Sequence, residues 1–181
     1  MKFSSSKHQL GVSLIESMIA ALVISVGLLG VAAMQVVAMK GSSHAFQQAQ
    51  ASDLMKELLE RMRSNTTAVF DDDYTIADSS SYKCNVVLSK NCMNGGTSCS
   101  AQELAKSDLY HTICGYDAAH LSGIRGSLSN GAIQISCLGG AGTCDQGINF
   151  KINWDERVLG KEGNGKNTLA REISLNTVIS Q

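Results

Sequence analysis

The hydrophobic pattern divides the chain into three stretches. Residues 12–39 are apolar almost throughout, and Ser17 to Met39 is a run of 23 residues without a charge. As a helix rising about 1.5 Å per residue, this run is roughly 34 Å long and can cross a hydrocarbon core about 30 Å thick. We therefore predict a first helical half that is apolar all round and needs lipid or a helical bundle around it.

Polarity rises over residues 40–65, but the pattern stays helical. Within Ala51–Arg63, apolar residues recur at spacings of three and four, which is typical of an amphipathic helix with one buried face. One helix over residues 13–64 would join both halves, with the apolar half protruding and the second half packed on the body. The apolar stripe comprises Leu54, Met55, Leu58, Leu59 and Met62, and two opposite-charge pairs at four-residue spacing accompany it, Lys56–Glu60 and Glu57–Arg61.

Beyond residue 65 the pattern predicts an α+β body. Ser100 and Glu103 have capping-box spacing and predict a short helix over about 101–113. Three later runs alternate with period two, and Gly- and Asn-rich loops at 139–147 and 160–167 can join them as antiparallel neighbours. A sheet with one apolar face laid on the helix stripe is the simplest closed core. The expected inward positions are Ile133, Ile135 and Cys137, then Ile148, Phe150, Ile152 and Trp154, then Ile173, Leu175, Thr177 and Ile179.

Charge and its distribution indicate the compartment. The 181 residues include 15 Lys+Arg and 16 Asp+Glu, so no basic surplus is available and nucleic acid is not expected as the main partner. Lys2 and Lys7 precede the apolar run and would stay cytoplasmic. We therefore expect a single membrane pass with the N-terminus inside the cell and the body exported to an oxidising compartment.

All six cysteines lie in the body. None is spaced C-x-x-C, which argues against a thioredoxin-type centre and a zinc ribbon. An even count in an exported domain predicts three disulfides, with fifteen possible connectivities. We expect one pair to close a hairpin, one to close a loop and one to bridge more distant segments: Cys137–Cys144, Cys92–Cys99 and Cys84–Cys114, respectively.

Other candidate chemistry is sparse. Asp71, Asp72 and Asp73, with Asp78 nearby, form an oxygen cluster that lacks the spacing and the glycine of an EF-hand loop, so a solvated acidic loop is favoured over a Ca²⁺ site. The histidines are scattered, and no nucleophile-elbow, zinc-protease or phosphate-loop motif is present. We therefore expect no enzyme, no catalytic residue, no cofactor and no metal.

Glu16 decides how the apolar run is interpreted. A signal peptide cut near Ala38 would have an unusually long apolar run with an acid inside it. A plain anchor leaves Glu16 unexplained, since a charge deep in a bilayer costs about 2.5–3.5 kcal/mol on insertion scales. Alternatively, a short basic leader ending in Gly11, with Val12 next and Glu16 fifth in the mature chain, resembles the leader junction of type IV prepilins.

That resemblance implies a processing and assembly pathway. Prepilin peptidase would cut between Gly11 and Val12 and methylate the new Val12 amine, and Glu16 would neutralise the N-terminal amine of a neighbouring subunit. The sequence departs from the family pattern at Val12, where Phe is usual.

Two further stretches resemble the PilV-type minor pilins, a GLLG-x-A-x-x-Q stretch over 27–35 and ERMR-x-N over 60–65. The similarity covers residues 11–65 well. It implies the pilin fold, disulfide-stabilised here, and a minor subunit acting in assembly priming or the tip complex. The implied partners are other minor pilins, the major pilin and a tip adhesin. The implied location is the inner membrane, with the body in the periplasm, before assembly, and the cell-surface pilus afterwards.

Two other interpretations of the function remain open. The same N-terminal features occur in minor pseudopilins of type II secretion, and a surface-anchored binding module for adhesion or DNA uptake is a separate class. Gly27 and Gly30 fit either close helix packing or a segment that bends. The resulting organisation is a leader over 1–11, a transmembrane or fibre-core half over 12–39, an amphipathic half over 40–65 and a disulfide-containing globular head over 66–181.

Overall fold

The computed structural model describes residues 14–86, 88, 90–93, 98–117, 122–139, 144–162 and 166–179. The leader junction at Gly11 and Val12 therefore lies outside the described residues. The chain divides into two compact units, Met1–Ser43 and His44–Gln181. We call the second unit the body and consider each unit by itself.

The predicted long helix is confirmed as α1, Leu14–Ser64, 51 residues. Every described residue of the first unit is exposed within the chain, and α1 is the one helix in the described part that is long and apolar enough to cross a membrane. The helix runs unbroken through Gly27 and Gly30, and a Cβ added at either would meet nothing within 4 Å. No packing inside the chain therefore requires glycine there.

In the body, the second part of α1 buries one face. Four of the five predicted stripe positions are buried and Leu54 is partly buried, while Ala51 joins the core as well. The predicted Glu57–Arg61 pair forms at 2.9 Å. The expected Lys56–Glu60 pair is wrong, because each side chain finds a partner three residues away: Lys56–Asp53 at 3.9 Å and Arg63–Glu60 at 2.6 Å.

Three further helices follow: α2 (Thr66–Phe70), α3 (Ala101–Cys114) and α4 (Ile124–Ser127). The predicted capping box at the start of α3 is confirmed, since the Glu103 backbone N–H donates to Ser100 Oγ and the Ser100 N–H donates to Glu103 Oε2. Each bond satisfies a backbone donor that the first helical turn leaves unpaired. Gly115 follows α3 with φ +87°, a backbone conformation that favours glycine.

The strands β1 (Ala132–Cys137), β2 (Ile148–Glu162) and β3 (Lys166–Thr177) form one antiparallel sheet in the order β1-β2-β3. The inward faces predicted for the first two strands are confirmed, with Cys137 only partly buried. On β3 the prediction is weaker, because Leu175 pairs with buried Phe150 yet stays 37% exposed on an edge strand, while Ile179 is buried just beyond the strand.

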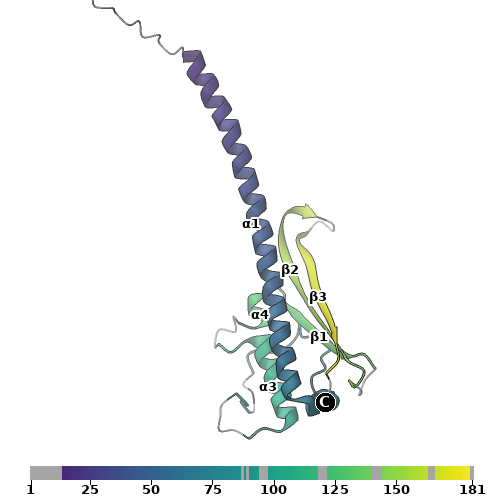
Figure 1. Cartoon of the computed structure of the whole chain (residues 1–181). Coiled ribbons are helices and arrows are strands. Elements are labelled where there is room, and N and C mark those ends of the chain that lie inside the picture. Colours follow the sequence, from purple (N-terminus) through teal and green to yellow (C-terminus); the bar gives the residue numbers. More distant parts are fainter. Residues whose placement is uncertain are drawn as a thin grey trace, which may run out of the picture. The chain divides into compact units, whose positions relative to one another are not determined.

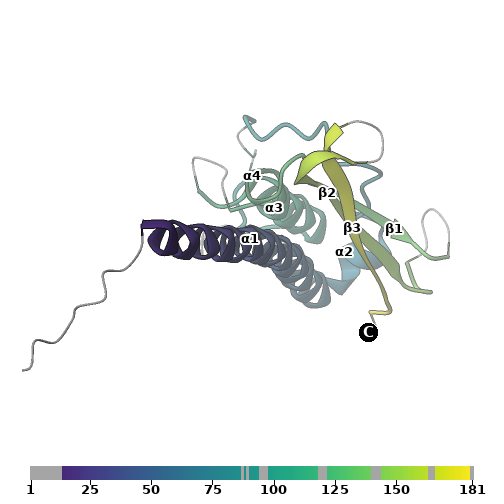
Figure 2. The same cartoon turned by 90° about the horizontal axis from the view of Figure 1, so that it is seen from above.

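Within the body, α3 and the second part of α1 lie on one side and the sheet on the other (Figures 1 and 2). Their apolar faces share one buried core. Polar contacts join β2 directly to α1: the Trp154 indole Nε1–H donates to Gln47 Oε1 at 3.1 Å, and Glu156 Oε2 lies 3.1 Å from His44 Nδ1 without forming a hydrogen bond with it. Arg171 of β3 donates to the same Glu156 oxygen at 2.6 Å. The expected disulfide-stabilised α+β fold is therefore present.

Leu58→Ala tests the shared core. Leu58 is fully buried, so truncation should lower the free energy of unfolding of the body by about 2–5 kcal/mol through lost burial and a cavity. The matched control is Leu138→Ala, at a side chain 48% exposed, which should change stability by no more than about 0.5 kcal/mol. Denaturant titration of the oxidised full chain in detergent, followed by Trp154 fluorescence, measures both. Equal effects of the two variants would contradict the core assignment.

Candidate functional site

The first candidate site is the apolar helix surface around Glu16. Glu16 lies in the first turn of α1 and is the only charged residue from Leu14 to Met39. Its carboxylate complements the partial positive charge of the helix N-terminus. The neighbouring exposed side chains are large and apolar: Leu14, Ile15, Met18, Ile19, Leu22, Val23, Ile24, Val26, Leu28, Leu29, Val31, Met34, Val36, Val37 and Met39.

This arrangement is suited to contact with other molecules rather than with its own body. Such a continuous apolar surface is stable only in lipid or against other helices. A carboxylate carried into either environment needs a cation to offset its desolvation. The surface can therefore accept a positively charged group from another chain.

The second candidate site is a buried polar cluster that holds the end of α1 in the body. Arg61 Nη1 donates to Asp108 Oδ1 at 3.0 Å, and the Asp108 side chain is only 3% exposed. The Tyr74 hydroxyl donates to the other Asp108 oxygen at 2.6 Å. Asn65 Nδ2 donates to the Tyr74 oxygen at 3.2 Å and to the Ala101 carbonyl at 2.8 Å. The cluster thus ties α1 to α3 through charge-assisted bonds.

The outer side of the cluster is aromatic. Arg61 Nη2 and the Tyr116 hydroxyl both donate to Glu57 Oε1, at 2.9 and 2.8 Å, and Arg61 Nη2 also contacts the Tyr116 hydroxyl. The Arg61 guanidinium lies 5.4 Å from the centre of the Tyr116 ring. The His111 ring stacks on the Tyr116 ring, with 4.7 Å between the two ring centres. These contacts limit how Arg61 can move.

The cluster perturbs three pKa values. Burial raises the pKa of Tyr74 and the bond to Asp108 raises it further. Burial also raises the pKa of Tyr116, with the bond to Glu57 acting in the same direction. For Arg61, burial lowers the pKa, but the bonds to Asp108 and Glu57 outweigh it and the net pKa is raised. All three groups therefore keep the protonated form that makes the observed bonds.

The sequence motif ERMR-x-N contributes to this cluster, but its structural role was not predictable. Arg61 and Asn65 belong to that motif, whereas Asp108 and Tyr74 carried no signal that marked them as partners. They are 47 and 13 residues from Arg61 in the chain, and both are brought to it by the fold.

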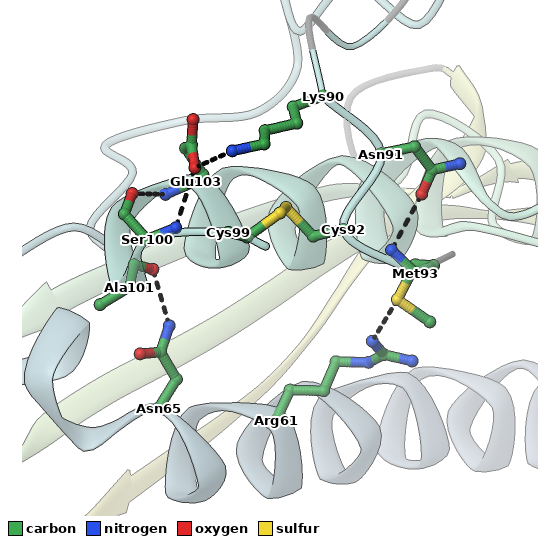
Figure 3. Close-up of a disulfide and its surroundings, with 10 residues drawn as sticks. All are labelled: Arg61, Asn65, Lys90, Asn91, Cys92, Met93, Cys99, Ser100, Ala101 and Glu103. Atoms are coloured by element: carbon green, nitrogen blue, oxygen red, sulfur yellow. Dashed lines mark hydrogen bonds and ion pairs between the residues drawn. A yellow bond between two sulfur atoms is a disulfide. The ribbon is translucent and has the colours of Figure 1, made fainter. Parts of the chain in front are cut away.

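A disulfide loop is attached to the same arginine (Figure 3). Cys92 and Cys99 are bonded with Cα atoms 6.0 Å apart, and Arg61 Nη1 donates to Met93 Sδ at 3.4 Å. On the other side of the loop, Lys90 Nζ lies 2.9 Å from Glu103 Oε2, the carboxylate of the capping box. The loop is therefore anchored to α1 and to the start of α3.

The other cysteines pair as Cys84–Cys114 and Cys137–Cys144, with Cα separations of 5.4 and 4.6 Å. The structure thus brings the six cysteines together in the same three pairs that we expected from the sequence. In the chain-entropy account, closing such loops stabilises the fold by restricting the unfolded chain, typically by about 2–4 kcal/mol for each disulfide.

The acidic loop makes internal contacts. Asp73 accepts from Gln102 Nε2 at 2.8 Å, and Asp78 accepts from the Ser80 backbone and hydroxyl at 2.9 and 2.7 Å. These Ser80 bonds lower the pKa of Asp78. Asp72 lies beside the Cys137–Cys144 disulfide, whose sulfurs are not free ligands. In the described part of the chain, these aspartates do not converge on one cation position.

Two histidines fall in the described residues. His44 faces Glu156, and His111 stacks on Tyr116. They lie on different helices and have different neighbours, so they do not form one site. His8 and His120 lie outside the described residues.

Asp108→Ala tests the polar cluster. Removing the buried carboxylate leaves Arg61 and Tyr74 without their shared acceptor, so the free energy of unfolding should fall by about 3 kcal/mol. Asp53→Ala is the control, because Asp53 is 77% exposed and its ion pair should contribute less than about 1 kcal/mol. Urea titration of the full chain measures the difference, and a loss below 1 kcal/mol for Asp108→Ala would contradict the role of the cluster.

Alkaline pH tests the same cluster independently. Tyr74 has a raised pKa when folded, so the unfolded chain loses the proton first and stability should fall as pH rises above about 10. Tyr74→Phe should remove part of this pH dependence, although the variant itself is less stable. Stability measured from pH 8 to pH 11 gives the slope. An unchanged slope in the variant would show that Tyr74 is not responsible.

Comparison with known proteins is consistent with this geometry. Residues 33–110 match the Tt1218-like family model, described as type IV pilin Tt1218, and this segment runs from within α1 into α3. No curated protein and no solved structure matches the chain. One N-terminal apolar helix fits a membrane-anchored pilin. The match covers less than half of the chain, so the chain is similar to a type IV pilin over that segment, and the long helix, the antiparallel sheet and the disulfides are consistent with the pilin fold.

Proposed function

We propose that this chain is a minor subunit of the type IV pilus, held in the inner membrane by residues 12–39 before it enters the fibre through the same segment. The observation that carries the proposal is a fully exposed apolar helix with one carboxylate in its first turn, attached to a disulfide-bonded body. The match to a type IV pilin family supports it.

Assembly depends on pairing Glu16 with an amine. Cleavage after Gly11 creates a positively charged amine at Val12, close to the start of α1. In a packed bundle, this amine on one subunit pairs with Glu16 of the next and offsets the desolvation of both charges. Because the amine and the carboxylate are different patches of the same chain, the contact is head-to-tail and generates an open helical assembly.

The proposal also assigns the chain a more specific role, that of a minor pilin of PilV type. It is supported by the sequence stretches over 27–35 and 60–65. In the second stretch, Arg61 and Asn65 contact the inside of the body, so they are suited to fixing the head on its helix rather than to binding a partner. The subunit then joins other minor pilins and the major pilin in a priming or tip complex and supports a tip adhesin.

Glu16→Gln tests fibre entry. The amide keeps the size of Glu16 but cannot form the ion pair. The amount of this chain recovered in sheared pili should therefore fall at least about tenfold. Glu60→Gln is the matched control, because the Glu60 side chain is 68% exposed on the same helix and, among the described residues, pairs with the exposed Arg63. N-terminal sequencing should give methylated Val12 for both variants in cells that carry the pilus machinery.

Three outcomes would contradict the proposal. Glu16→Gln could enter pili at the wild-type level, Glu60→Gln could be lost equally, or the recovered chain could start near Met39. Gene deletion separates the two functional classes: loss of pili supports an assembly role, whereas normal pili with lost adhesion or DNA uptake support a binding module. A requirement for protein secretion instead of pili would assign the subunit to a type II secretion pseudopilus.

A further inference from the structure

A hollow of about 530 Å³ lies on the body beside α4, away from both sites described above. It is lined by residues 80–85 and Arg125. A smaller hollow of about 270 Å³ shares Ser80 and Arg125 and adjoins Asn130 and Gly131. Nothing in the proposed assembly mechanism uses this surface.

The hollow carries two cations, Arg125 and Lys83, for which the described residues provide no acidic partner. Among the described residues, no carboxylate forms an ion pair with Arg125 or Lys83, whereas Lys90, Lys151 and Arg171 all have one. The residues that the structure describes around the larger hollow include no acidic side chain. Two carboxylates lie just outside and are already bonded: Asp78 to Ser80, and Asp155 to Asn130 Nδ2 at 2.9 Å.

The exposed Arg125 side chain contacts the segment that lines the hollow. Its Nη1 donates to the Tyr82 carbonyl oxygen. The remaining guanidinium N–H groups have no bond within the described part of the chain. A fixed arginine loses less conformational entropy when it binds a ligand.

The segment that Arg125 contacts is fixed at both ends. The Ser79 backbone N–H donates to the Ile133 carbonyl at 3.1 Å, and the Ile133 N–H donates to Ser79 Oγ at 2.8 Å. At the other end, Cys84 is bonded to Cys114, and its carbonyl accepts from the Tyr110 hydroxyl at 2.9 Å. The segment between these anchors, which carries Lys83, is therefore preorganised.

We propose that this hollow binds a phosphate group. A guanidinium fork, an ammonium, the Ser81 hydroxyl and the Asn85 amide supply several donors around one concave surface without an acid among them. The hollow has room for a phosphate carried by a small soluble molecule or by a lipid headgroup. This inference goes beyond the proposed function and does not depend on fibre entry.

Calorimetric titration of the full chain in a non-ionic detergent with inorganic phosphate, at constant ionic strength in chloride, tests the proposal. Binding should be saturable for the wild type, at least tenfold weaker for Arg125→Gln and several-fold weaker for Lys83→Gln. Arg125→Lys keeps the charge without the fork and should bind with intermediate affinity. The matched control is Arg63→Gln, an exposed arginine on α1 paired with Glu60, and it should bind as the wild type does.

Circular dichroism and Trp154 fluorescence establish that each variant is folded. Absence of saturable binding above the chloride blank would overturn the proposal, and so would an equal loss in Arg63→Gln. A second arm identifies the source of the phosphate by repeating the titration in nanodiscs of phosphatidylcholine with and without phosphatidylglycerol. Arg125-dependent competition by phosphatidylglycerol supports a lipid headgroup, and an unchanged affinity supports a soluble phosphate ligand.

Discussion

The ion pair between Arg61 and Asp108 is the interaction on which the rest of the body depends. It lies where the last turns of α1 meet α3, and it is stabilised by the Tyr74 hydroxyl on one side and by Glu57 on the other. A buried carboxylate is stable only when its oxygens are hydrogen-bonded or paired with a cation, and here each Asp108 oxygen accepts one bond. The same guanidinium reaches Met93 in the disulfide loop, so the helix, the core and the loop share one charged group.

This interaction matters because α1 has to satisfy two environments at once. Its first part exposes apolar side chains in all directions, and its second part must hold the body with a single buried stripe. Apolar contact along such a stripe is non-directional and allows sliding or rotation. Directional bonds from Arg61, Asn65 and Gln47 fix the register of the helix against α3 and β2.

Features encoded by short spacings were predictable from the sequence. The capping box, the helix stripe and the alternation on β1 and β2 depend only on neighbours within a few residues, and the structure contains all of them. Leu175 was less predictable because its exposure depends on β3 being an edge strand. Lys56 pairs with Asp53 instead of Glu60. The sequence could not distinguish these two pairs, because both would be solvent-exposed ion pairs of similar, small energy. The Asp108 and Tyr74 contacts had no local signature, since only the complete fold brings them to Arg61.

The attachment of β2 near the start of the body has a consequence for the apolar segment. His44 and Gln47 are the first described α1 residues with polar contacts to the sheet: His44 lies beside Glu156, and Gln47 accepts a hydrogen bond from Trp154. The helix ahead of them, residues 14–43, is about 45 Å long at 1.5 Å per residue. Drawing more of α1 into a helical bundle would require breaking these bonds and uncovering Trp154. The sheet therefore limits the length of α1 that is free of contacts with the body, and this free length ends where His44 and Gln47 meet β2.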